Sequence, residues 1–127
     1  DDQLWKYMLK LNEACLGLPF HGTVITCSHF LPRRGLPLPT IPGHKTGKSS
    51  GCERIDDLVR GVRSKLHVFG HSRERYFAMH NGVSYVNQPL GYGNEQHGID
   101  LLPMLLVYDG RTTCARPWDI VLDRPQS

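Results

Sequence analysis

Two histidines each follow a short apolar stretch, and their type and placement suit the binding of a metal ion. His29 follows the apolar residues 24–28, and His71 follows residues 66–69 and a glycine. Imidazole is the commonest metal ligand among side chains. In open α/β sheets, ligands gather outside the carboxyl ends of parallel strands. If the two stretches are neighbouring parallel strands, the sequence predicts that His29 and His71 form part of a metal site.

The residues between the two stretches predict the helix that would make them parallel. Ser50 and Glu53 have the spacing of a capping box. Apolar residues at helical spacing follow, namely Ile55, Leu58, Val59 and Val62. A strand, a helix and a second strand make a βαβ unit, whose crossover is right-handed in nearly all proteins. The two predicted strands therefore run parallel and end at the same edge of one sheet.

The amino-terminal third predicts one helix, one strand and a long loop. Residues 4–16 predict a helix with one buried stripe, made of Leu4, Trp5, Met8, Leu11, Cys15 and Leu16. Residues 23–28 are mostly apolar and predict a strand buried on both faces. Residues 30–49 are rich in proline and glycine and predict a loop, which starts beside a candidate ligand and could shape a substrate site.

After residue 73 the sequence predicts two β-hairpins, one at 75–80 with 83–87 and one at 104–108 with 112–115. The first pair flanks Asn81-Gly82, the strongest short signal for a type I′ turn, and the second flanks Asp109-Gly110. Residues 120–122 predict a further edge strand.

Composition favours a single domain and excludes several classes of partner. The 127 residues are 39% hydrophobic, enough for one modest core. The net charge of +3 is spread over scattered basic residues, so neither a nucleic-acid partner nor a polybasic membrane patch is expected. No stretch has the length of a membrane span. The four cysteines form no C-x-x-C pair, and we expect Cys15 and Cys27 to be buried reduced thiols, which favours a reducing intracellular compartment.

Other polar groups favour simpler interpretations. Residues 43–49 resemble a phosphate-binding P-loop, but three residues rather than four separate the glycines, which favours a flexible basic loop. The remaining histidines that lack ligand spacing are expected at the surface; these are His21, His44, His80 and His97.

Three motifs together resemble those of the calcineurin-like metallophosphoesterases. Residues 26–33 (Thr-Cys-Ser-His-Phe-Leu-Pro-Arg) are similar to the family's strand-to-His motif, and residues 67–73 (His-Val-Phe-Gly-His-Ser-Arg) to its Gly-His-x-His motif. Residues 82–95 are similar to its closing hairpin and Leu-Gly-Tyr loop. The order and spacing match. The resemblance covers nearly the whole chain, 1–127, but only the carboxyl-terminal half of the family's domain.

The resemblance implies a fold and a set of site residues. The fold is α/β: half of an α/β/β/α sandwich, with one βαβ unit followed by β-hairpins. His29 and His71 would ligate the same one of two divalent metal ions (Mn, Fe or Zn) in an active protein, whereas a degenerate protein would need none. The alternative is that both are vestigial histidines, hydrogen-bonded at the ends of their strands. Asn87, Tyr92 and Glu95 would brace the loop beside the site. Active members of the family hydrolyse phosphate esters with a metal-bound hydroxide.

The chain departs from the family in two ways. Arg73 stands where the second histidine of Gly-His-x-His would ligate the other metal, and a fixed cation does not replace a neutral imidazole. Arg73 is therefore either a contact to phosphate or to a neighbouring carboxylate, or else an exposed charge or a mark of lost activity. The family's amino-terminal motifs, Asp-x-His, Gly-Asp-x-x-Asp and Gly-Asn-His, do not occur in this sequence.

Two functions remain open, and so does enzymatic activity. The favoured one is a degenerate or partial metallophosphoesterase-fold protein that acts as a subunit or scaffold of a larger assembly. The alternative is half of an active dinuclear-metal phosphoesterase, completed by an amino-terminal half outside these residues. An uncovered sheet face and edge predict a partner, which is either that half or another protein chain.

Overall fold

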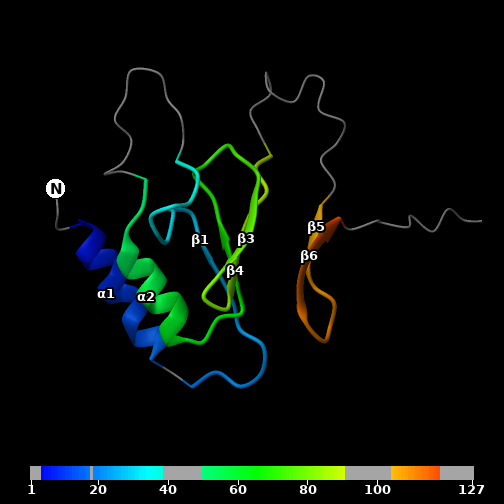
Figure 1. The fold of residues 1–127 in the computed structure, drawn as a ribbon. Coiled ribbons are helices and arrows are strands. Elements are labelled where there is room, and N and C mark those ends of the chain that lie inside the picture. Colours follow the sequence, from blue (N-terminus) through cyan, green and yellow to red (C-terminus); the bar gives the residue numbers. More distant parts are fainter. Residues whose placement is uncertain (1–3, 18, 39–49, 91–103, 118–127) are drawn as a thin grey trace, which may run out of the picture. The chain divides into compact units, whose positions relative to one another are not determined.

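The computed structural model describes residues 4–17, 19–38, 50–90 and 104–117. The chain divides into two compact units, Asp1–Pro89 and Leu90–Ser127, which are described separately. The first unit is mixed α/β, with helices α1 (Leu4–Leu16) and α2 (Glu53–Gly61) beside a small sheet (Figure 1). The α/β class predicted from the sequence is thus confirmed.

The sheet of the first unit has four strands in the order β1-β2-β4-β3. Their bounds are Ile25–Ser28 for β1, Leu66–Phe69 for β2, Tyr76–His80 for β3 and Val83–Asn87 for β4. β1 pairs with β2 in parallel, β2 pairs with β4 in parallel, and β3 and β4 form an antiparallel pair. The predicted parallel pairing of the first two strands is confirmed, with Thr26 opposite His67.

Helix α2 connects β1 to β2 but does not begin with the predicted capping box. Its N-cap is Cys52, which makes no side-chain capping bond. Leu31 and Gly51 form an isolated parallel bridge, in which the Leu31 amide donates to the Ser50 carbonyl and the Cys52 amide to the Leu31 carbonyl. The capping-box prediction was wrong because this extended pairing keeps residues 50–52 out of the helix.

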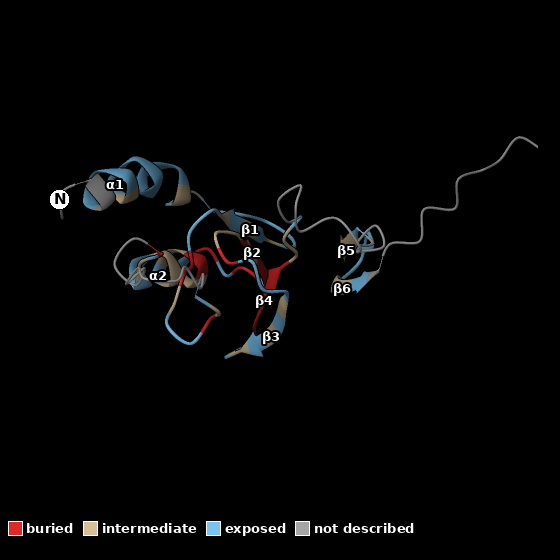
Figure 2. Ribbon diagram, turned by 90° about the horizontal axis from the view of Figure 1, so that it is seen from above, coloured by how far each residue is buried: buried red, intermediate tan, exposed pale blue. Residues whose placement is uncertain are grey.

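The core lies on one face of the sheet. Phe69, Val83 and Tyr85 point from the strands toward Val59 of α2. The buried side chains of Leu31 and Leu36 complete this cluster, so the segment after β1 contributes to the core although it is neither helix nor strand. Figure 2 shows α1 and α2 on the same side of the sheet, with buried residues on the strands and on the facing side of α2.

Strand β1 is an edge strand, and the prediction that it is buried on both faces was wrong. Ile25 is 37% exposed, and Cys27 is exposed as well. Both side chains point to the face of the sheet opposite the core cluster, because they alternate with Thr26 and Ser28. Cys15 on α1 is also exposed, so neither thiol is buried as expected. All four cysteines are free.

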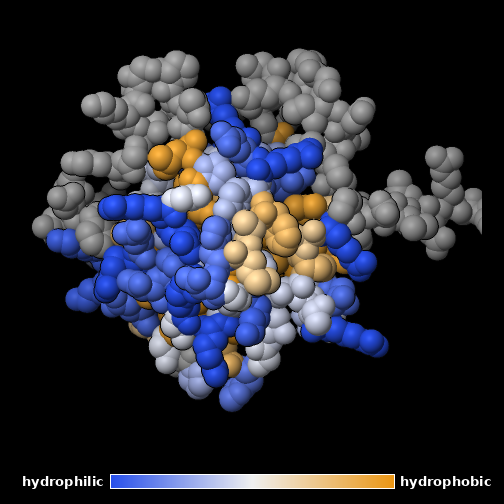
Figure 3. All heavy atoms as spheres, viewed as in Figure 1, coloured by the Kyte–Doolittle hydropathy of each residue, from blue (hydrophilic) through white to orange (hydrophobic). Residues whose placement is uncertain are grey.

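Helix α1 has the predicted bounds, but the middle of its predicted apolar stripe is exposed. Met8 and Leu11 are about half exposed, at 52% and 54%. Leu16 is partly buried, and α1 contacts α2. In Figure 3, hydrophilic side chains gather over the helices, whereas hydrophobic side chains reach the surface over the sheet. None of the described helices is long and apolar enough to cross a membrane.

Both predicted hairpins form. Asn81 and Gly82 join β3 to β4 with φ values of 49° and 81°, the positive values that a type I′ turn requires. In the second unit, β5 (Leu105–Tyr108) pairs with β6 (Thr113–Pro117). Their turn is held by the Asp109 carboxylate, which accepts hydrogen bonds from the two following non-glycine amides. The predicted strand at 120–122 lies outside the described residues.

Candidate functional site

The structure brings His29 and His71 together at the carboxyl ends of two parallel strands. His29 directly follows β1, and His71 follows β2 after one glycine. His71 Nδ1 lies 3.3 Å from His29 Nε2, and the two ring centroids are 5.3 Å apart. Two residues that are 42 positions apart in the chain therefore bring their ring nitrogens within hydrogen-bond distance of each other.

The backbone around the histidine pair is tightly fitted. The Gly70 amide donates a hydrogen bond of 3.2 Å to the His29 carbonyl. A Cβ at Gly70 would lie 3.2 Å from that same oxygen, which is closer than ordinary contact. His71 has a φ of 63°, in the left-handed region that costs a residue with a side chain about 1–2 kcal/mol. The fold thus holds a strained residue at the candidate site.

The electrostatics keep His71 neutral. Partial burial, with a smaller contribution from the neighbouring His29 ring, lowers the pKa of His71 below its ordinary value. The neutral imidazole is the form that binds metals, because a protonated ring has no free lone pair. The lowered pKa therefore favours the form of His71 that can act as a ligand.

The spacing of the two nitrogens also fits a shared metal ion. Two nitrogens held about 2.1 Å from one ion at a tetrahedral angle are about 3.4 Å apart. The observed 3.3 Å between His71 Nδ1 and His29 Nε2 agrees with that value. Within the part of the chain that the structure describes, no group of three or more potential ligand side chains gathers around a common point. The pair would thus supply two ligands and leave the other coordination positions to other groups.

Asn87 holds the turn that follows His71. Its side chain is 3% exposed, and its Nδ2 donates to the carbonyls of Ser72 at 2.9 Å and Glu74 at 2.7 Å. Arg73 lies between those two carbonyls in sequence, and its side chain is exposed. Of the residues predicted to brace the loop, Tyr92 and Glu95 lie outside the described residues.

Comparison with known proteins gives no identification. No protein-family model, curated protein or solved structure matches the chain. The function is therefore inferred from the residues and their geometry alone.

Phe30 is part of the site although the sequence analysis did not single it out. Its ring centroid lies 5.0 Å from that of His29 and 5.3 Å from that of His71. The side chain is 46% exposed. It gives the histidine pair one apolar side, and its position directly after His29 was the signal available in the sequence.

His67 was also missed, and it lies deeper in the same strand pair. The side chain is 1% exposed, and burial lowers its pKa to about 4, against a small opposing effect of Asp56. Nδ1 lies 2.8 Å from the Thr26 hydroxyl and Nε2 lies 2.9 Å from the Ser28 hydroxyl. The signal was present in the register, because parallel pairing of the two predicted strands puts these three polar side chains on one face.

The other histidines do not join the pair. His21 is exposed as expected. His80 is partly buried rather than at the surface, because the Tyr76 hydroxyl lies 2.6 Å from its Nε2 and the two rings stack. His44 and His97 lie outside the described residues.

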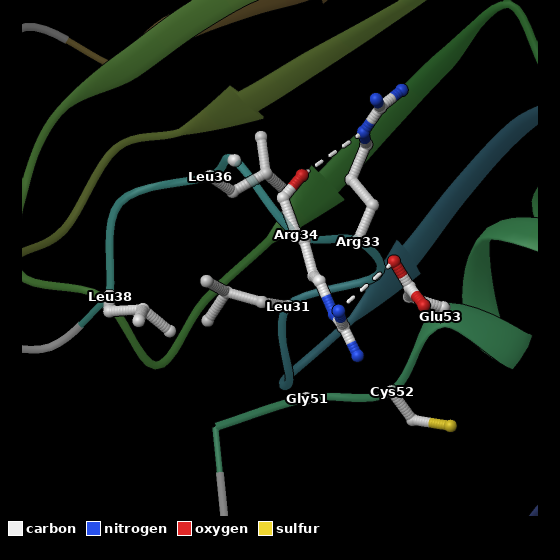
Figure 4. A pocket seen from close by; sticks show the side chains of 9 residues that line it. Leu31, Arg33, Arg34, Leu36, Leu38, Gly51, Cys52 and Glu53 are labelled. Atoms are coloured by element: carbon white, nitrogen blue, oxygen red, sulfur yellow. Dashed lines mark hydrogen bonds and ion pairs between the residues drawn. The ribbon is translucent and has the colours of Figure 1, made fainter. Parts of the chain in front are cut away.

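A pocket of about 570 Å³ opens between residues 31–38 and 51–53 (Figure 4). Arg34 and Glu53 form an ion pair of 3.5 Å at its wall, and Arg33 also lines it. Neither histidine of the pair lines this pocket. The pocket and the histidine pair are therefore separate features.

Proposed function

We propose that this chain is a partial metallophosphoesterase-type protein that acts as a subunit of a larger assembly, and that His29 and His71 provide two ligands of a divalent metal site. The observation that carries this proposal is the 3.3 Å separation of two ring nitrogens at the carboxyl ends of adjacent parallel strands. A divalent ion bound there would polarise a phosphoryl oxygen and lower the pKa of a bound water.

The chain's own residues prepare this site. Asn87 fixes the turn after His71, and Gly70 fixes the carbonyl of His29, so both imidazoles are held by buried or backbone groups. Phe30 packs against both rings of the pair. Arg73 follows His71 by two residues with an exposed guanidinium, which suits a contact to a phosphate oxygen.

The subunit role is supported by apolar side chains that are exposed on the two edge strands of the sheet, whereas Leu66 and Val86 of the inner strands are buried on the same face. Phe77 and Met79 of β3 are 58% and 68% exposed, and Ile25 and Cys27 of β1 point to the same face by the register. Exposed apolar surface of this kind marks an interaction site or an aggregation liability. We propose that it packs against a second apolar sheet, which carries the acidic ligands that the histidine pair lacks.

Metal titration of the chain tests the site. We expect one Zn²⁺ or Mn²⁺ to bind, with affinity reduced at least about tenfold by His29→Ala or by His71→Asn. Asparagine is chosen at position 71 because it tolerates the left-handed backbone. His21→Ala is the control, since it removes an exposed histidine outside the pair. Equal affinity in wild type and His29→Ala would contradict the proposal.

The apolar face is tested with Phe77→Lys/Met79→Lys. Both side chains are exposed, so we expect the folded state to persist while the solubility of the isolated chain rises and its binding of a hydrophobic dye falls. Tyr7→Lys on α1 is the control, because Tyr7 is also exposed, at 59%, but lies on another element. A wild-type chain that is already monomeric and binds no dye would contradict the predicted partner surface.

The alternative function, half of an active phosphoesterase, is favoured by the neutral state of His71. It predicts that a separate polypeptide carrying the Asp-x-His, Gly-Asp-x-x-Asp and Gly-Asn-His motifs restores hydrolysis of an aryl phosphate when it is mixed with this chain. Hydrolysis that is lost with His29→Ala would support it. A stable complex without hydrolysis would favour the scaffold.

A further inference from the structure

A chain of hydrogen-bonded hydroxyl groups, buried at its Ser64 end and exposed at its Phe30 end, connects His67 to the residues on both sides of His29. We infer that His67 is a positioning residue for His29, acting through the Ser28 hydroxyl; this rests on the proposed ligand role of His29. Ser28 Oγ lies 2.9 Å from His67 Nε2 and donates a hydrogen bond of 2.6 Å to the Phe30 carbonyl. The hydroxyl thus spans His29 and fixes the residues before and after it.

Through its other ring nitrogen, Nδ1, His67 is connected to Thr26 and the buried Ser64. Nδ1 contacts the Thr26 hydroxyl at 2.8 Å, and that hydroxyl lies 2.9 Å from Ser64 Oγ. Ser64 Oγ reaches the Leu66 carbonyl at 2.8 Å. Five contacts in a row therefore run from the Leu66 carbonyl to the Phe30 carbonyl, and the His67 ring is the middle member that joins the two ends.

The number of hydrogens that the side chains can donate decides which of the five contacts are hydrogen bonds. The five contacts need one hydrogen each, but three hydroxyls and one neutral imidazole supply only four. A protonated His67 would supply the fifth. One added hydrogen bond contributes about 0.5–1.5 kcal/mol, whereas placing a cation in a buried site costs several kcal/mol. The neutral ring therefore prevails, in agreement with its low pKa.

The missing hydrogen falls at the Ser64 end of the chain. The Ser28 hydroxyl has one hydrogen, and its 2.6 Å contact with the Phe30 carbonyl is the shortest of the five. Ser28 must then accept from His67, which places the ring proton on Nε2. Ser64 has a choice between the hydroxyl of Thr26 and the carbonyls of Leu66 and Val24, so a contact there can be left unmade.

His29 is therefore held from β2 at two points. The Gly70 amide binds its carbonyl oxygen, and His67 orients the Ser28 hydroxyl that spans it. Without the bond between His67 and Ser28, the Ser28 hydroxyl would no longer be held, and only the Gly70 amide would still hold the backbone of His29. The His29 ring would then sample positions away from His71, and a shared metal would bind more weakly.

Two substitutions at position 67 separate positioning from general stability. In His67→Gln the side-chain amide lies as many bonds from Cα as Nε2 does, so it can still donate to Ser28. In His67→Asn the amide lies as far as Nδ1, so it keeps Thr26 and loses Ser28. Both remove a buried ring and should lower the melting temperature. We expect only His67→Asn to weaken Zn²⁺ or Mn²⁺ binding, by about tenfold.

A second pair of variants covers the case in which position 67 does not tolerate change. Ser28→Ala removes the spanning hydroxyl from a partly exposed position and should weaken metal binding as His67→Asn does. Thr26→Val keeps the shape of the side chain and breaks the contacts of the Thr26 hydroxyl with His67 Nδ1 and Ser64 Oγ. It leaves the bond between His67 and Ser28 in place and should leave the affinity unchanged. Unchanged affinity in Ser28→Ala and His67→Asn would overturn the inference.

A measurement without metal separates this inference from the proposed function. Cross-relaxation between the ring protons of His29 and His71 in the metal-free chain reports their proximity. We expect it to persist in wild type, His67→Gln and Thr26→Val, and to fall in His67→Asn and Ser28→Ala. If this pattern holds but wild type binds no metal, the positioning role stands and the metal site is wrong. If metal binds but the pattern is absent, the positioning role is wrong.

Discussion

The Tyr85 hydroxyl, in the middle of β4, donates a hydrogen bond to the Asp56 carboxylate on α2. Arg60 completes this connection, since its Nε donates to Asp56 at 2.9 Å and its Nη2 lies 3.1 Å from the Tyr85 oxygen. Tyr85 is fully buried, and the interaction is charge-assisted. It fixes the helix of the βαβ unit against the sheet.

We therefore expect Tyr85→Phe to lower the free energy of unfolding by about 1.5–3 kcal/mol, the range for a hydrogen bond to a charged group. Urea unfolding measures this change. Tyr76→Phe is a matched control, because the Tyr76 hydroxyl bonds the partly buried ring of His80 rather than a carboxylate, and its removal should cost about 1 kcal/mol. Equal effects of the two substitutions would contradict the special role of the Tyr85 contact.

The burial of neutral His67 predicts an acid-sensitive fold. Its pKa is about 4 in the folded state and about 6.5 in the unfolded chain, so the unfolded state binds more protons between these values. Stability is fully present above pH 6.5 and falls as the pH drops toward 4, by about 3 kcal/mol. Urea unfolding of wild type and His67→Gln at pH 7.5 and 4.5 measures this. Identical pH dependence in the two proteins would show that His67 is not responsible.

The close approach at Gly70 makes a specific prediction. In Gly70→Ala the new methyl group meets the His29 carbonyl at 3.2 Å, so the backbone of His29 must shift by a few tenths of an ångström. We expect a loss of about 1 kcal/mol in the free energy of unfolding and a clear loss of metal affinity. Gly61→Ala on α2 is the control, because a Cβ there meets nothing within 4 Å. An unaltered affinity in Gly70→Ala would count against a rigid histidine pair.

Two substitutions of Asn87 should differ in stability because only one of them introduces a negative charge. Asn87→Ala leaves two carbonyls of the turn at 72–74 without their donor, which should cost about 1–3 kcal/mol. Asn87→Asp has nearly the same shape, but at neutral pH its carboxylate only accepts hydrogen bonds and faces two carbonyl oxygens. We expect it to be the less stable variant at pH 7 and to recover partly in acid. Thermal melts at several pH values distinguish the two.

The parallel pairing of β1 and β2 was predictable because it follows from sequence patterns within each strand and within the helix between them. An apolar stretch, a helical stripe and a second apolar stretch allow one handedness of crossover, and Thr26 opposite His67 follows. The Asn81-Gly82 turn was likewise local, since these residues favour the positive φ that the turn needs. His29 and His71 lie together for the same reason, because each of them follows one strand of this parallel pair.

Burial of β1 was not predictable, because it depends on what covers the strand. An apolar strand at an edge has the same sequence pattern as one in the middle of a sheet, and Ile25 and Cys27 are exposed. The start of α2 was misplaced by a contact with Leu31, twenty residues away from Gly51. The local sequence therefore predicts neither the exposure of β1 nor the residue at which α2 begins.

The topology also orders the steps by which the chain would fold. The β3–β4 hairpin joins neighbours along the chain, whereas the residues that are paired in the register of β1 and β2 lie 41 positions apart. Closing the longer segment has the larger entropic cost and is slower. We therefore expect the β3–β4 hairpin to form first and β2 to pair with β4 after it. We expect β1 to pair with β2 in the last, rate-limiting step of folding, which brings the imidazoles of His29 and His71 together.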